Sequence, residues 1–96
     1  MMSAYVVVDV DVLDPDGLAA YRQAGVPTIA AHGGRVLARS DDVVVLEGEW
    51  KPRRVVVLEF DDIETVHRWH ASPEYQRARL LRLEAARTQS IAVPGV

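Results

Sequence analysis

The chain has 96 residues, of which 49% are hydrophobic and 26% charged, and its formal net charge at pH 7 is -3. This length suits one small core, which predicts a single domain over residues 1–96. The acidic balance argues against a nucleic-acid partner, because "KPRR" at residues 51–54 is too short to form a basic surface. The sequence contains no cysteine, which excludes disulfides, thiol catalysis and thiolate metal sites.

No segment has the pattern of a membrane span or of a targeting signal. The apolar runs fall well short of the roughly 20 residues that cross a bilayer. The opening "MMSAYVVVDV" lacks the basic region and the cleavage site of a secretory signal. We therefore expect a cytoplasmic protein with no membrane partner.

The first part of the chain predicts a strand followed by a helix. Residues 4–13 are rich in β-branched side chains and alternate in their second half, which favours a strand. In the "DPDG" that follows, Asp14 suits a helix N-cap and Pro15 the first helical position. Gly25 and Pro27 are expected to break this helix, leaving a short second helix after them.

The rest of the chain predicts three extended segments, a helical region and a last strand. The extended segments are residues 35–39, 43–47 and 54–60. Asp61 or Asp62 can cap a helix with Ile63, Val66 and Trp69 on one stripe. Ser72 and Pro73 restart this helix in "SPEY", and residues 90–93 form the last strand.

The resulting β-α-β-β-α-β order predicts an α+β fold of the ferredoxin-like type, an antiparallel sheet with its helices on one face. The strands are nevertheless apolar on both faces, since Tyr5 and Val7 alternate with Val6 and Val8. An antiparallel sheet with one wet face should alternate more cleanly. We therefore expect a second copy of the chain to cover the free face, which makes a homodimer.

Several short motifs resemble, in order and spacing, the bacterial family called domain of unknown function 1330. They are "HGGRVLAR", "LEGEW", "PRR", "VVVLEF" and "WHASPEYQ", followed by Arg82, and the resemblance covers residues 5–95. It implies a ferredoxin-like fold that dimerises through its sheets, within the dimeric α/β-barrel superfamily. That superfamily includes cofactor-free monooxygenases, isomerases and polyketide cyclases, so no cofactor is expected. Membership assigns no reaction.

The "AHGGRVLARS" stretch at residues 31–40 reads first as a tight turn. Glycine takes positive φ without penalty, and Gly33 and Gly34 lead into a strand rather than into a helix N-terminus that would bind a phosphate. His32 ends the preceding helix, where a capping or surface role competes with a role in substrate binding.

Arg35 and Arg39 are four residues apart and are predicted to share one face of their strand. If that face points into a dimer interior, each arginine needs an anionic partner. Asp9 and Glu59 can supply it in a buried ion-pair network. The alternative is that the arginines clamp a small carboxylate, enol or phenolate ligand.

Glu47 and Trp50 in "LEGEW" are a candidate base and a candidate substrate platform. A glutamate at a strand end, followed by Gly48, can point into a cleft, and burial would raise its pKa toward that of a general base. Asp9 is the second candidate base. In the alternative interpretation Glu47 pairs with a neighbouring arginine and Trp50 packs at the dimer seam.

Three aromatic or charged residues of the second helical region, Trp69, Tyr75 and Arg82, are candidates for the rim of a substrate pocket, or else anchor the helices on the sheet. His67 and His70 share a helix face, with Glu74 a turn beyond. Spacing fixes no third ligand, so we predict no metal site.

Three functions remain open at this point. The first is a cofactor-free enzyme whose dimer interior binds a small aromatic, enolic or polyketide-like substrate, with Glu47 or Asp9 as base and Arg35 or Arg39 stabilising the anion. The second is a binding or accessory protein that uses the same pocket without chemistry. The third is a structural dimer whose interior is filled by side chains.

Overall fold

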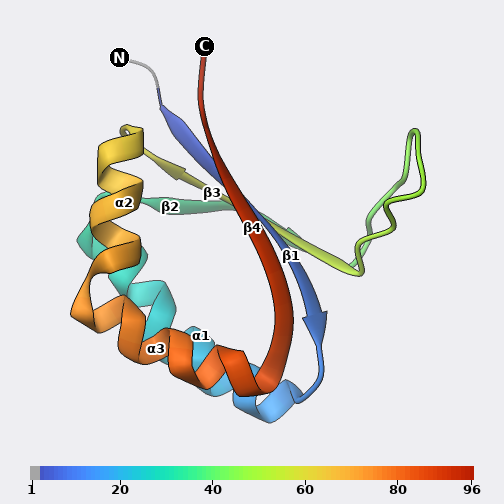
Figure 1. Cartoon of the computed structure of the whole chain (residues 1–96), viewed down its shortest axis with the longest axis horizontal. Helices are drawn as coiled ribbons and strands as arrows, with labels where there is room; N and C mark the ends of the chain where they lie inside the picture. Colours follow the sequence, from blue (N-terminus) through green and yellow to red (C-terminus); the bar gives the residue numbers. More distant parts are fainter. Residues whose placement is uncertain (1–2) are drawn as a thin grey trace.

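A four-stranded antiparallel sheet carries three helices on one of its faces (Figure 1). The computed structural model describes residues 3–96. The elements are β1 (Ala4–Val12), α1 (Pro15–Ala31), β2 (Arg35–Ser40), β3 (Arg54–Phe60), α2 (Ile63–Ala71), α3 (Pro73–Ala85) and β4 (Ala86–Pro94). The strands lie in the order β2-β3-β1-β4, and all neighbours are antiparallel. This confirms the ferredoxin-like α+β fold.

The helices begin at the residues that the sequence predicts. The side chains of Asp14, Asp62 and Ser72 each accept a hydrogen bond from a backbone N–H two or three residues further on. Pro15 and Pro73 follow directly, where a missing N–H costs no intrahelical bond. The second helical region is therefore two helices, since Ser72 ends α2 and caps α3.

The expected break in the first helix is wrong, because α1 continues through both Gly25 and Pro27. Gly25 is buried where α1 crosses α3, and a Cβ built on it would lie 3.6 Å from the Cβ of Ala78. The hydroxyl of Thr28 donates to the Gly25 carbonyl at 2.6 Å. Pro27 lies on the exposed side of the helix, where water can bond the carbonyl that proline leaves free.

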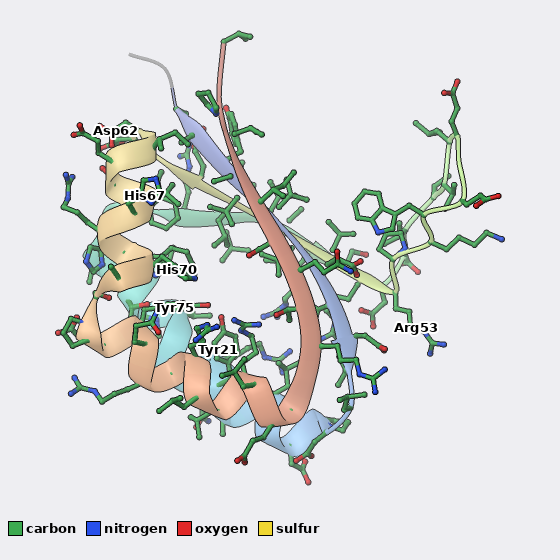
Figure 2. The ribbon with its side chains drawn as sticks, in the orientation of Figure 1. Tyr21, Arg53, Asp62, His67, His70 and Tyr75 are labelled. Atoms are coloured by element: carbon green, nitrogen blue, oxygen red, sulfur yellow. The ribbon has the colours of Figure 1, made fainter. Side chains whose placement is uncertain are left out.

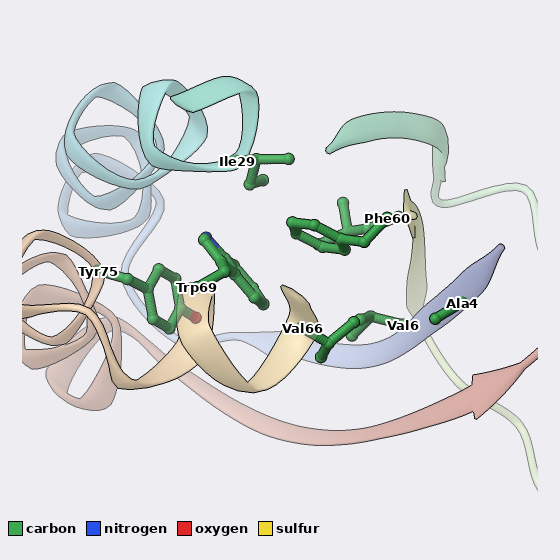
Figure 3. Close-up of a cluster of buried hydrophobic side chains, with 8 residues drawn as sticks. Ala4, Val6, Ile29, Phe60, Val66, Trp69 and Tyr75 are labelled. Atoms are coloured by element: carbon green, nitrogen blue, oxygen red, sulfur yellow. The ribbon is translucent and has the colours of Figure 1, made fainter. Parts of the chain in front are cut away.

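The main core lies between the helices and the sheet (Figure 3). Trp69 lies between two other rings, with its centroid 5.0 Å from that of Phe60 and 4.3 Å from that of Tyr75. Val6 and Val66 complete the contact between β1 and α2. These side chains fix α2 and α3 over one part of the sheet.

A β-bulge in β2 changes the predicted position of one arginine. Arg35 pairs with Glu59 and Val36 with Leu58, but the next partner pair is Ala38 with Val57, so Leu37 is the extra residue. Because side chains alternate along a strand, one extra residue moves all later side chains to the opposite face. Arg35 and Arg39 therefore lie on opposite faces, and the predicted shared face is wrong.

The segment between β2 and β3 forms a projecting arm, residues 41–53 (Figure 1). The short extended segment predicted at residues 43–47 is not a strand, because it has no neighbour with which to pair. Two of its side chains, Val44 and Leu46, are 78% and 89% exposed. The arm thus carries apolar side chains away from the core.

The last strand begins earlier than predicted, since β4 starts at Ala86 and pairs with β1 along its whole length. Pro94 lies opposite Ala4, and the next residue, Gly95, donates its N–H to the Ser3 carbonyl at 2.5 Å. Proline is thus tolerated at the end of this edge strand.

The sheet face that the helices leave uncovered, called the open face below, is apolar. Tyr5, Val7, Val55 and Val57 are half-buried on the central strands, while Ile91 is 64% exposed. The prediction of a sheet that is apolar on both faces is confirmed. Among residues 3–96, no helix is long and apolar enough to span a membrane.

Candidate functional site

A cavity of about 350 Å³ lies between the helices and the sheet, within the single chain. Its sheet side is formed largely by valines of β1 and β3, including Val6, Val8, Val10 and Val56. Its helix side includes Trp69. The size and the apolar lining are those of a small-molecule site.

The charged residues that line this cavity are cations. They are the four arginines Arg22, Arg39, Arg54 and Arg82. Two histidines, His67 and His70, also line the cavity, and no Asp or Glu is among the described residues of the lining. Arg54 is neutralised by Asp41, whose carboxylate accepts from its Nε at 2.6 Å. Within residues 3–96, the other three arginines form no ion pair. The cavity therefore has uncompensated positive charge.

Two tyrosines from different helices meet at the cavity wall. The hydroxyls of Tyr21 on α1 and Tyr75 on α3 lie 3.0 Å apart. Burial, with the neighbouring Tyr75, raises the pKa of Tyr21 above its usual value. The guanidinium carbon of Arg82 lies 5.8 Å from the centre of the Tyr21 ring, and its Nε is buried without a hydrogen-bond partner. A donor in this state is suited to a ligand oxygen.

His70 lies at the same end of the cavity, on α2. Figure 2 shows it one turn after His67 and close to Tyr75, whose ring centroid is 5.5 Å from that of His70. Partial burial lowers the pKa of His70, and the positive charges of Arg79 and Arg82 lower it further. His70 is accordingly a neutral imidazole at pH 7, able to accept a proton.

Trp69 contributes to the cavity wall and to the fold at once. Its indole N–H donates to the Thr28 hydroxyl at 3.0 Å, which ties α2 to α1. Of the residues predicted for a pocket rim or an anion clamp, Trp69, Tyr75, Arg82 and Arg39 line this cavity.

The other candidates lie on the open face or on the arm. Arg35 donates from Nε to Glu59 at 2.6 Å, and this bond holds the pKa of the Glu59 carboxyl below its usual value. Asp9 accepts from the indole N–H of Trp50 at 3.0 Å. Glu47 is exposed on the arm. None of these five side chains lines the cavity.

The glycine pair has the role of a turn. Gly33 takes φ +73° after α1 ends, and a Cβ built on Gly34 would lie 2.5 Å from the Phe60 ring. His32 caps the helix end, with its Nδ1 2.9 Å from the Thr28 carbonyl oxygen. This histidine is also outside the cavity lining.

In the described part of the chain, no three side chains of His, Asp or Glu lie close enough together to hold a metal ion. His67 and His70 share a face of α2 and both line the cavity. What they have near them is arginine rather than carboxylate.

Sequence reasoning missed Tyr21, Arg22 and Arg54 as lining residues and considered His70 only as a metal ligand. The signal for the first two is visible in retrospect. Tyr21 and Arg22 follow Leu18 at helical spacing, so they share its core-facing side. Two polar side chains on the core-facing side of a helix indicate a pocket that water or a ligand can enter.

A family model described as domain of unknown function (DUF1330) matches residues 3–96. The chain belongs to this family. No curated protein matches the sequence.

Solved structures with the same fold cover nearly the whole chain. RPA0582, a protein of unknown function from Rhodopseudomonas palustris, has a TM-score of 0.76 at 19% identity, over 99% of this chain and 83% of its own. SnoaB, a cofactor-independent oxygenase from Streptomyces nogalater, has 0.71 at 12%, over 97% and 92%. A dimeric ferredoxin-like protein of unknown function from Jannaschia sp. CCS1 has 0.65 at 10%, over 95% and 97%. At these identities the similarity shows the fold.

Proposed function

We propose that the cavity binds a small, largely apolar organic anion of the aromatic, enolic or polyketide-like class. The observation that carries the proposal is an apolar cavity whose charged lining is arginine and histidine without a carboxylate. Arginine binds carboxylates and other oxyanions through charge-assisted hydrogen bonds. In an apolar surrounding such bonds are stronger than in water.

We further propose that the protein is a cofactor-free enzyme of the monooxygenase, isomerase or cyclase type. These reactions share the formation of an oxyanion at an enol or phenol, which a fixed cation such as Arg82 stabilises. The fold similarity to a cofactor-independent oxygenase supports this proposal. The base is then a residue of the cavity rather than Glu47 or Asp9, which lie outside it.

The alternative is a binding protein that performs no chemistry in the same cavity. Burial raises the pKa of Tyr21, so its hydroxyl stays protonated and offers no phenolate as a base in this cavity. The third alternative is a structural dimer that binds no ligand, and the cavity of about 350 Å³ within each chain favours a ligand-binding protein over it.

The binding test compares 2-naphthoate with its neutral analogue 2-naphthamide by titration calorimetry. We expect the carboxylate to bind more tightly. Arg82→Gln should weaken it by about 1.5–3 kcal/mol, which is roughly tenfold to a hundredfold in Kd. Arg39→Gln, on an exposed strand, should act in the same direction.

The matched control is Arg35→Gln, which removes an arginine from the same strand but on the open face. It should leave the affinity for 2-naphthoate unchanged. Equal affinity of the two probes would contradict the anion site. Dioxygen consumption with 1-naphthol and 2-naphthol then separates an oxygenase from a binding protein.

We also propose that two copies of the chain pair through their open faces. The apolar side chains of this face, together with Val44 and Leu46 on the arm, support an interface. The hydrogen bond from Trp50 to Asp9 joins the arm to this face. Proteins of this fold from Jannaschia and Thermobifida are described as dimeric.

A further inference from the structure

The polar end of the cavity is surrounded by cations from several elements. The charged or titratable groups that line the cavity with His70 are Tyr21 and Arg22 on α1, Arg39 on β2, Arg54 on β3, His67 on α2, and Tyr75 and Arg82 on α3. Asp41 on the arm pairs with Arg54, and Arg79 on α3 acts on His70 from outside the lining. From β1 and β4, the described lining has no titratable side chain. The balance of charge around His70 is therefore positive, and Asp41 offsets only one arginine.

His70 is a histidine at this end of the cavity, and an imidazole can change its charge near neutral pH. It is exposed on one side, so protons can reach it from water, while its ring packs near Tyr75 and Trp69. Its backbone carbonyl accepts a bond from the side chain of Gln76 at 2.6 Å, which holds this end of α2 against α3. The backbone of His70 is thus held at the junction of α2 and α3, and its imidazole is open to water.

We propose that the cavity takes up its ligand as an oxyanion together with one proton, and that His70 holds this proton. Burial and the positive charges of Arg79 and Arg82 disfavour the imidazolium of His70 in the empty cavity. An oxyanion at Arg82 offsets one of these charges and attracts the imidazolium. Imidazolium and arginine then neutralise the ligand together. This coupling rests on the proposed anion site and adds to it the identity of the proton acceptor.

The proton comes from a different source for each class of ligand. A carboxylate is already ionised at pH 7, so the proton on His70 comes from solvent and binding consumes it. With a phenol or an enol, the O–H bond of the ligand breaks, its proton moves to the His70 imidazole and its electron pair stays on oxygen beside Arg82. No net proton is then exchanged with solvent, and the ligand is activated as its anion.

The experiment is calorimetric titration of 2-naphthoate at pH 7 in phosphate and in Tris, whose ionisation enthalpies differ strongly. The difference in apparent enthalpy gives the number of protons taken up. We expect an uptake between zero and one for the wild type. Affinity should increase as the pH falls from 8 to 6, by at most tenfold per pH unit, because one proton is linked to binding.

Two variants assign the proton. His70→Gln should bind 2-naphthoate with no proton uptake and with an affinity that no longer depends on pH. His32→Gln is the matched control, because it removes a histidine outside the cavity lining. It should keep the wild-type uptake.

The outcomes distinguish the anion site from the role of His70 as proton acceptor. Binding without proton uptake overturns the role of His70 and leaves the anion site intact. Uptake that persists in His70→Gln assigns the proton to another group and overturns the inference as well. If 2-naphthoate does not bind at all, both the inference and the proposed function fail.

Discussion

The two faces of the sheet are both apolar, but their charged residues are in opposite states. On the open face the predicted site residues already have partners, as Arg35 has Glu59 and Asp9 has Trp50. On the helix-covered face Arg82 has a buried Nε without a partner, and Arg22 forms no ion pair within residues 3–96.

This difference separates a structural role from a binding role. A charge that is satisfied inside the chain needs no ligand, whereas a cation left unpaired in an apolar cavity costs free energy until an anion arrives. The comparison therefore points to the helix-covered face for ligand binding and to the open face for contact between copies.

The largest expected effect tests the contribution of the two faces to stability. Phe60→Ala removes a ring that is 1% exposed on the helix-covered face, and should lower the free energy of unfolding by about 3–5 kcal/mol. Val57→Ala, on the open face of the same strand, should cost much less. Urea unfolding followed by tryptophan fluorescence measures the free energy of unfolding of both variants. Similar losses would contradict the prediction that the helix-covered face contributes more to stability than the open face.

The next effect concerns assembly. Val57→Asp places a carboxylate in the middle of the open face, where two copies would bring like charges together, so we expect a monomer at micromolar concentration. Light scattering after size exclusion gives the mass. Leu80→Asp, an equally drastic change at a site 63% exposed on α3, should keep the wild-type mass. A Val57→Asp dimer would remove the open face as the interface.

His70 in the cavity should make the free energy of unfolding depend on pH. The pKa of His70 is lower in the folded chain than in the unfolded one, so the unfolded state binds its proton more readily. Stability is therefore fully present above the ordinary histidine pKa near 6.5 and decreases as the pH falls below it. Urea midpoints between pH 8 and 5 should show this slope, and His70→Gln should flatten it.

The smallest effect is expected for Glu47, the first candidate base predicted from the sequence. Glu47 is exposed on the arm, so Glu47→Gln should change neither the affinity for 2-naphthoate nor any turnover by more than about twofold. Arg82→Gln in the same assay is the positive control, since it removes a residue of the cavity and should weaken binding. A large loss in Glu47→Gln would mean that the arm reaches a cavity in the assembled protein.

Features with local physical causes were predicted well from the sequence. The caps at Asp14, Asp62 and Ser72 depend on a side chain and a backbone N–H two or three residues away, so the sequence contains both partners. The alternation in β1 assigned Val6 and Tyr5 to opposite faces in the same way.

Features that depend on distant contacts were missed. Gly25 and Pro27 are helix breakers locally, but the close packing of α1 against α3 at Gly25 keeps the helix continuous. The site was expected between the sheets of two copies, because both sheet faces are apolar. Arg39 was placed there with Arg35 because the residues of β2 were counted at a strict period of two. The lining of the actual cavity comes from all three helices and the sheet together, and no short stretch of sequence contains it.

The bulge at Leu37 has a consequence for comparing members of this family. A relative without the extra residue can be aligned with this chain over β2 without a gap. Its residue matched to Arg39 would then lie on the other side of the sheet. Whether the relative has an arginine at the position aligned with Arg39 says nothing about its ligand until a gap is placed opposite Leu37. Deleting Leu37 from this chain should instead remove the bulge and leave Arg39 opposite Val56, with its positive charge still in the ligand compartment.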